Sequence, residues 1–256
     1  MYYCFIYIIC FFCQTMYYTL PYTIPNFICD NHDTLTAWGC ARLLQQAADN
    51  HTKLFGIGFQ QLQQQHKAWV LCRTYYDVRR LPVDYEEVTV RTWSRGTDGL
   101  YAWRDFEMTD KEGTVIVAGT TSWVIIDTNA RHVVRLGSII QGFEHHTDKA
   151  TNLDRLGRIR FPKGEEGELV VEHQQVKHSM LDHTQHVNNA EYIKWVFDNL
   201  PEDMTTEAPF ILDVEYLQET RPDESVDIHR LALPDGTLMF KITNNRTTAV
   251  VATLKK

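Results

Sequence analysis

The feature that most constrains this fold is an internal repeat, because one order of predicted elements occurs twice along the 256 residues. In the first half, apolar residues recur at helical spacing within residues 27–56, after Asp and Thr residues suited to capping. Strand patterns follow at 68–80 and 86–94, and a turn at 110–113 joins two further strand patterns in a hairpin. A repeated unit of this size predicts two modules packed side by side.

The second half shows the same order of elements. A strand pattern at 168–176 precedes a helical stripe of Ala190, Ile193, Val196, Phe197 and Leu200. Strand patterns follow at 210–219, 224–233, 237–244 and 247–255, and Pro82 of the first copy is matched with Pro222 of the second. We therefore expect an α+β protein, with each copy made of a strand, a central helix and an antiparallel meander.

Composition limits the possible partners and compartment. The formal net charge of −8 argues against nonspecific binding to nucleic acid, since phosphates repel a negative protein. Residues 1–15 are apolar but too short to span a bilayer, and we interpret them as an N-terminal extension from an over-long start. Four of the six cysteines lie near the N-terminus and the other two, Cys40 and Cys72, are isolated thiols, which favours a reducing, cytoplasmic setting.

A polar cluster precedes the second helix. Asp182, Thr184, His186 and Asn188 lie within "LDHTQHVNN", whereas the first copy has acids but no His-x-Asn. The start of a helix can stabilise negative charge on a carbonyl oxygen, and a nearby carboxylate or imidazole can activate water or attack. This pattern favours acyl transfer or hydrolysis at a polarised carbonyl.

Simpler interpretations compete with this chemistry. Asp182 or Thr184 could be N-caps, and Asn188 could satisfy backbone groups of the first turn. His183, His186 and Asp182 would make a thin metal-ligand set. Glu219, at the end of a strand pattern, would by pattern alone be a surface acid.

The residues also carry a family likeness. The segment "LDHTQHVNNAEYIKW" resembles the signature of hotdog-fold thioesterases, and both halves in register resemble acyl-acyl carrier protein (acyl-ACP) thioesterases of the plant and bacterial type. The resemblance covers roughly residues 17–253 and implies two fused hotdog modules, each an antiparallel sheet wrapped around a central helix. We expect an N-terminal module at 16–137, a connector at 138–166 and a catalytic module at 167–256.

The resemblance implies hydrolysis of fatty acyl-ACP to free fatty acid and holo-ACP during fatty acid biosynthesis, without metal or cofactor. Asp182, His186 and Glu219 match catalytic positions. Thr184 replaces an Asn common in plant members, and Thr220 replaces a Cys, which rules out a cysteine nucleophile here. We expect water between the two acids and His186, or direct attack by Asp182, with backbone N–H groups near Asn188 holding the oxyanion.

Several alternatives stay open in the sequence. The substrate could be acyl-coenzyme A, or the chain could be a non-catalytic acyl-binding module, and a monomer or a homodimer would fit. Arg95, Arg104, Arg158 and Arg160 are candidates for a basic rim that receives the acidic carrier. Apolar residues around the first helix are expected to set the depth of the acyl pocket; these are Leu43, Leu44, Leu54, Phe55 and Phe59.

Overall fold

The computed structural model describes residues 17–140, 145–162, 169–202, 204–245 and 247–256. The predicted extension at 1–15 lies outside the described residues. The first half contains β1 (Tyr18–Thr23), α2 (Ala37–Leu54), α3 (Phe59–Gln63), β2 (Lys67–Val78), β3 (Glu87–Thr97), β4 (Ala102–Thr109), β5 (Val115–Asp127) and β6 (His132–Val134). The second half contains β7 (Leu169–Gln175), α4 (Asn189–Asp198), β8 (Phe210–Tyr216), β9 (Ser225–Ala232), β10 (Leu238–Asn244) and β11 (Thr248–Lys255).

All strands of the described residues belong to one antiparallel sheet. Its order is β1-β3-β4-β5-β2-β8-β11-β10-β9-β7, with β6 beside β5. Read from its outer edge, each half has the same order, so β1, β3, β4, β5 and β2 correspond to β7, β9, β10, β11 and β8. The halves join where β2 pairs with β8, from Arg73 opposite Glu215 to Val78 opposite Phe210. The expected α+β architecture of two similar modules is confirmed.

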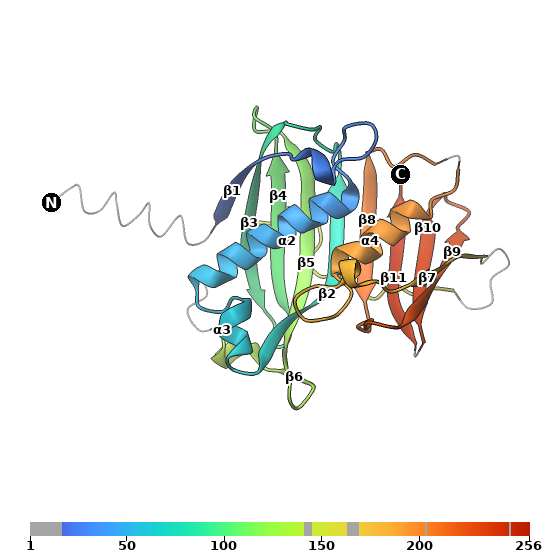
Figure 1. The fold of residues 1–256 in the computed structure, drawn as a ribbon. Helices are drawn as coiled ribbons and strands as arrows, with labels where there is room; N and C mark the ends of the chain where they lie inside the picture. The colour runs from blue at the N-terminus through green and yellow to red at the C-terminus, as the bar shows by residue number, and fades with distance from the viewer. Residues whose placement is uncertain (1–16, 141–144, 163–168, 203, 246) are drawn as a thin grey trace.

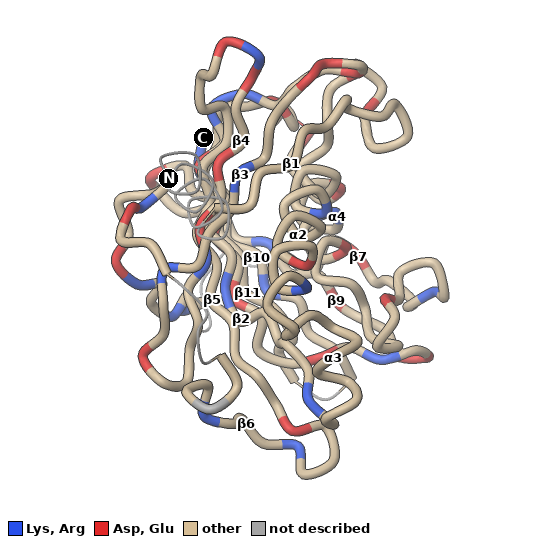
Figure 2. Tube along the Cα trace, turned by 90° about the vertical axis from the view of Figure 1, so that its left-hand side faces the viewer, with Lys and Arg blue, Asp and Glu red and all other residues tan. Residues whose placement is uncertain are grey.

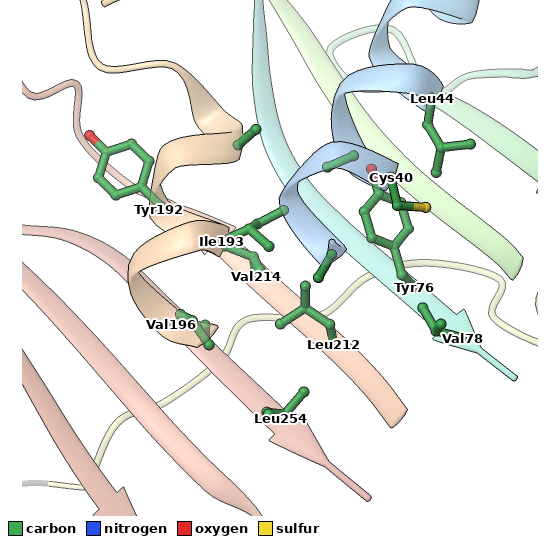
Figure 3. Close-up of a cluster of buried hydrophobic side chains, with 14 of the residues drawn as sticks. Cys40, Leu44, Tyr76, Val78, Tyr192, Ile193, Val196, Leu212, Val214 and Leu254 are labelled. Atoms are coloured by element: carbon green, nitrogen blue, oxygen red, sulfur yellow. The ribbon is translucent and has the colours of Figure 1, made fainter. Parts of the chain in front are cut away.

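The two long helices lie on the same face of the sheet (Figure 1). Thr36 caps α2 by accepting a hydrogen bond from the Gly39 N–H, as the sequence predicts. The core below the helices crosses the junction between the modules (Figure 3). Leu44 of α2 and Ile193 of α4 are almost fully buried, and each contributes about 1.5–3 kcal/mol by leaving water.

Most predicted elements are confirmed, including the hairpin turn in which Gly113 adopts a φ of 82°. Three short elements were not identified in the sequence. β1 is an edge strand that contains Pro21, and proline lowers the strand signal. α3 is five residues long and rich in glutamine, and β6 has three residues, so neither offers a period to detect.

The matching of Pro82 with Pro222 was wrong by two positions. Pro82 accepts the Leu35 N–H through its carbonyl oxygen, and Thr220 accepts the Val187 N–H in the same way. Thr220 is therefore the counterpart of Pro82. Pro82 directly precedes a turn and Pro222 lies within one, and because proline is common at such places, the two prolines were matched although their positions differ.

The connector packs on the face of the sheet opposite the helices. Arg104 points toward α2, where it contacts His51, so its neighbour Asp105 points the other way. Asp105 accepts the Ala150 N–H of the connector at 2.8 Å. His146 of the connector packs against Tyr17, with Nε2 2.6 Å from the tyrosine hydroxyl. Charged residues of both signs are scattered over the loops and edges (Figure 2).

Candidate active site

A tight loop brings Asp182 and His186 face to face before α4. An isolated antiparallel bridge pairs Leu181 with Val187, and the Asp182 N–H donates to the His186 carbonyl at 2.8 Å. Gln185 turns the chain with a φ of 63°. The four-residue spacing in the sequence is therefore the spacing of a closed turn, and it places both side chains on one side of the loop.

A line of hydrogen bonds runs through this loop. Oδ1 of Asp182 accepts the Thr184 N–H at 2.7 Å and the Thr184 hydroxyl at 2.5 Å. Oγ1 of Thr184 lies 3.2 Å from Nδ1 of His186, and Nε2 of His186 lies 3.2 Å from Oε2 of Glu219. The structure thus brings together Asp182, Thr184, His186 and Glu219.

Glu219 is also held by two arginines. Its Oε1 lies 2.8 Å from Nη2 of Arg131 and 2.8 Å from Nη2 of Arg221. Partial burial alone would raise the pKa of Glu219, but the Arg221 hydrogen bond, the charge of His186 and the contact with Arg131 together lower it below its usual value. Glu219 is therefore poised as a carboxylate, not as an acid.

Asn188 is the N-cap of α4, and its Oδ1 accepts the Ala190 N–H at 2.9 Å. Its own N–H donates to the Met180 carbonyl, and the Val187 N–H donates to Thr220. Among the described residues, the Asn189 N–H has no hydrogen-bond partner, and Asn189 lines the cavity described below. Several backbone N–H groups near Asn188 were expected to be free to hold the oxyanion. Within the part of the chain that the structure describes, only the Asn189 N–H is free, and the Asn188 side-chain amide is a second candidate donor.

A cavity of about 660 Å³ opens at these residues and extends into the N-terminal half. Its wall includes Leu217 and Glu219 after β8, Trp69 and Leu71 of β2, Trp123 and Ile126 of β5, Arg104 of β4 and Ser94 of β3. Crossing from β8 to β3 involves four strand spacings, a span of roughly 19 Å at about 4.8 Å each. The cavity is therefore long, with Asp182, His186 and Glu219 among its lining residues, and it has room for a linear apolar chain.

The residues predicted to set the pocket depth are mostly elsewhere. Of that set, only Phe59 lines the cavity, since Leu44 is buried in the core and Leu54 is 63% exposed. The cavity side of α2 is instead a helical stripe of small and polar residues, namely Gln45, Ala48, Asp49 and Thr52. Phe59 also closes over the loop, with its ring centroid 3.8 Å from that of His183.

The proposed basic rim is not present in the predicted form. Arg95 is nearly buried against Asp105 on the connector side of the sheet, and Arg104 is buried in the cavity wall. Burial lowers the pKa of Arg104 to about 10. Arg158 and Arg160 are exposed on the connector, on the face away from the helices. The cations beside Glu219 are Arg131 and Arg221, and no motif in the sequence marks either of them.

Thr220 does not face the opening. It is fully buried, and its hydroxyl lies 3.5 Å from Nδ2 of Asn244. The neighbouring Glu219 points into the cavity, so the two side chains diverge. A nucleophile at position 220 would have no access to a substrate in this arrangement.

Neither a metal cluster nor a membrane helix is found in the described part of the chain. Within residues 17–140, 145–162, 169–202, 204–245 and 247–256, no three His, Cys, Asp or Glu side chains lie close enough to hold a metal ion. Over the same ranges, no helix has the length and apolar character needed to cross a membrane.

Comparison with known families identifies both halves of the chain. The acyl-ACP thioesterase N-terminal domain matches residues 15–140, and the acyl-ACP thioesterase C-terminal domain matches residues 163–253. The chain is 24% identical over 237 residues to oleoyl-acyl carrier protein thioesterase 2, chloroplastic, of Arabidopsis thaliana, covering 84% of this chain and 64% of that protein. It thus spans somewhat less than two thirds of the length of this relative.

Solved structures share the fold over almost the whole chain. An acyl-ACP thioesterase from Bacteroides thetaiotaomicron superposes with a TM-score of 0.82 at 21% identity, covering 94% of this chain and 98% of that one. A 12:0-ACP thioesterase from Umbellularia californica gives a TM-score of 0.81 at 19% identity, covering 94% and 96%. At these identities the likeness concerns the fold, which is that of two hotdog modules.

Proposed function

The chain belongs to the acyl-ACP thioesterase family, and we propose that it hydrolyses the thioester of fatty acyl-ACP to a free fatty acid and the carrier thiol. One observation carries this proposal: a carboxylate, a hydroxyl, an imidazole and a second carboxylate lie in contact at the opening of a long cavity. The cavity suits an acyl chain, and the opening suits a polarised carbonyl.

The two carboxylate oxygens of Asp182 have different contacts, and we assign them different roles. Oδ1 accepts hydrogen bonds from the loop, whereas Oδ2 has no partner among the described residues. We assign Oδ2 as the oxygen that acts on the thioester, either by taking a proton from water or by attacking the carbonyl carbon. The Asn189 N–H and the Asn188 amide are the donors we assign to the developing oxyanion.

The positions of the hydrogen atoms between Asp182, Thr184, His186 and Glu219 give His186 a different role from that of the two carboxylates. A carboxylate only accepts, so Nε2 of His186 carries the hydrogen in its contact with ionised Glu219. When the single Thr184 hydrogen is donated to Asp182, Nδ1 of His186 must donate to Oγ1 as well. In that state His186 cannot be the base, and we assign it as the acid that protonates the departing thiolate.

The test is release of free thiol from acyl-ACP of graded chain lengths, with the same acyl groups on coenzyme A in parallel. We expect rapid release from the carrier protein and release slowed by about 100-fold or more in Asp182→Asn. Faster release from coenzyme A would assign the substrate to the other carrier. Tight binding of acyl-ACP without thiol release would contradict the hydrolase proposal.

We also propose a reducing compartment, cytoplasmic in the simplest case. Cys29, Cys40 and Cys72 are free thiols, and burial raises the pKa of Cys40 to about 12, which keeps it protonated and unreactive. The Arabidopsis relative is named as a chloroplastic protein. Fractionation of the native host, followed by immunodetection of the chain, would distinguish these locations.

A further inference from the structure

Arg131 reaches the candidate site from the opposite half of the chain. It ends the turn between β5 and β6, and its Nη2 lies 2.8 Å from Oε1 of Glu219. Asp127 closes the turn by accepting the N–H groups of Asn129 and Ala130. Arg131 itself has a φ of 55°, a conformation that is unfavourable for a non-glycine residue. The turn therefore holds Arg131 in a defined direction.

The two oxygens of Glu219 have different partners. Oε1 takes both arginines, and Oε2 faces Nε2 of His186 at 3.2 Å. Arg221 is two residues from Glu219 on the same segment, so its contact is local. Arg131 approaches from the other module and anchors Oε1 from a second direction. With Oε1 anchored twice, the carboxylate can rotate little, and Oε2 stays directed at His186.

Stability and carrier binding are weaker explanations for this contact. The Arg131 side chain is 65% exposed, and an exposed ion pair contributes little to folding stability. The phosphate of a phosphopantetheine arm is separated from the thioester by the length of the arm. A guanidinium already bound to Glu219 beside the reacting groups is too close to the thioester to be its phosphate site.

We propose that Arg131 is a positioning residue, supplied by the N-terminal module to the site of the C-terminal module, which directs Glu219 toward His186. The inference rests on the proposed thioester hydrolysis. It gives the N-terminal module a part in the chemistry besides forming the cavity. Around Glu219 the structure places these charged and titratable side chains: Arg131, Arg221, Glu224, Asp182, His183, His186 and Tyr192.

The test compares Arg131→Gln with Arg131→Lys and with Arg135→Gln. Arg135 is exposed and forms no ion pair with the residues that the structure describes, so its loss controls for the change in net charge. Each variant is first checked for an unchanged melting temperature. Steady-state thiol release then gives kcat and KM, and carboxyl ¹³C NMR gives the titration of Glu219, assigned from its absence in Glu219→Gln.

We expect Arg131→Gln to lower kcat by about 10-fold or more while KM is unchanged, because a misplaced catalytic group slows the reaction without weakening binding. The titration of Glu219 should move to higher pH, Arg131→Lys should recover most of both properties, and Arg135→Gln should match the wild type. Wild-type kcat and titration in Arg131→Gln would overturn the inference, as would a change confined to KM. A moved titration in a chain that releases no thiol would contradict the thioesterase proposal while supporting the Arg131–Glu219 contact.

Discussion

Asp30 and Asp182 occupy the same position in two copies of one loop. Oδ1 of Asp30 accepts the N–H groups of His32 and Thr34 at 2.8 and 3.0 Å, as Oδ1 of Asp182 accepts those of Thr184 and His186 at 2.7 and 3.5 Å. Both loops are closed by an isolated bridge, Cys29 with Leu35 and Leu181 with Val187. The aspartate thus holds the loop together in both modules. Only in the second module do neighbouring side chains, those of Thr184, His186 and Glu219, form a candidate active site with it.

This equivalence supplies a matched pair of variants. Asp182→Asn should lower kcat by about 100-fold or more, because the amide cannot act as base or nucleophile. Asp30→Asn should leave kcat unchanged, since Thr34 stands where His186 stands in the second copy. Both amides retain an oxygen that accepts the loop N–H groups, so both variants should melt within a few degrees of the wild type. Equal kcat losses in the two variants would show that the loop, and not the Asp182 carboxylate, matters.

The same loops show what sequence reasoning could and could not provide. The helical period of α2 and α4 and the strand alternation follow from burial of one face, which the sequence records residue by residue. The sequence also singled out Asp182 and His186 and noted acids in the first copy. It did not reveal that Asp30 accepts the same backbone N–H groups as Asp182, because residue type carries little information about backbone hydrogen bonds.

Contacts between distant segments could not be predicted from the sequence for a different reason. Arg131 and Glu219 are separated by 88 residues and meet only because β2 pairs with β8. The cavity wall from α2 consists of Ala48 and polar neighbours, a stripe that looks like a solvated helix face until the sheet is in place. The sequence pattern predicts which residues are apolar and periodic, but not which of two faces lines a cavity.

Thr184 should be required for its hydroxyl. It donates to Asp182 and lies 3.2 Å from Nδ1 of His186, so Thr184→Val removes both links while keeping the shape. We expect kcat to fall by about 10- to 100-fold, the range for loss of a group that supports proton transfer. Thr184→Ser should retain most of the activity, and stopped-flow thiol detection would measure both. A fully active Thr184→Val protein would exclude the hydroxyl from the mechanism.

Asn188 should matter for stability as well as for activity. As the N-cap of α4 it accepts the Ala190 N–H, and loss of such a cap costs about 1 kcal/mol. Thr36→Ala removes the corresponding cap of α2 and should lower the free energy of unfolding by a similar amount with kcat unchanged. Urea denaturation and thiol release on both proteins separate the two roles. If Asn188→Ala loses stability alone, its amide is not an oxyanion donor.

The pH dependence of kcat should follow the ionised form of Glu219. Burial raises the pKa of Glu219, but the Arg221, His186 and Arg131 contacts outweigh it and lower the pKa below that of an ordinary glutamate. The carboxylate therefore stays ionised as pH falls through the usual glutamate range, and activity that depends on it is lost only below that range. Glu219→Gln, which cannot ionise, should be slow at every pH, as a kcat profile from pH 3 to 8 would show.

The length of the cavity should limit the length of the acyl chain. Ala48 lies on the cavity side of α2 and is 6% exposed, so a larger side chain at this position extends into the cavity of about 660 Å³. We expect Ala48→Leu to shift the preferred acyl-ACP to a shorter chain, because the added methyl groups occupy space that the last carbons of the substrate would fill. The rate on short chains should stay near that of the wild type, since Asp182, His186 and Glu219 are unchanged in this variant. Thiol release across a chain-length series measures this shift, and an unchanged preference with full activity would place the end of the acyl chain outside this cavity.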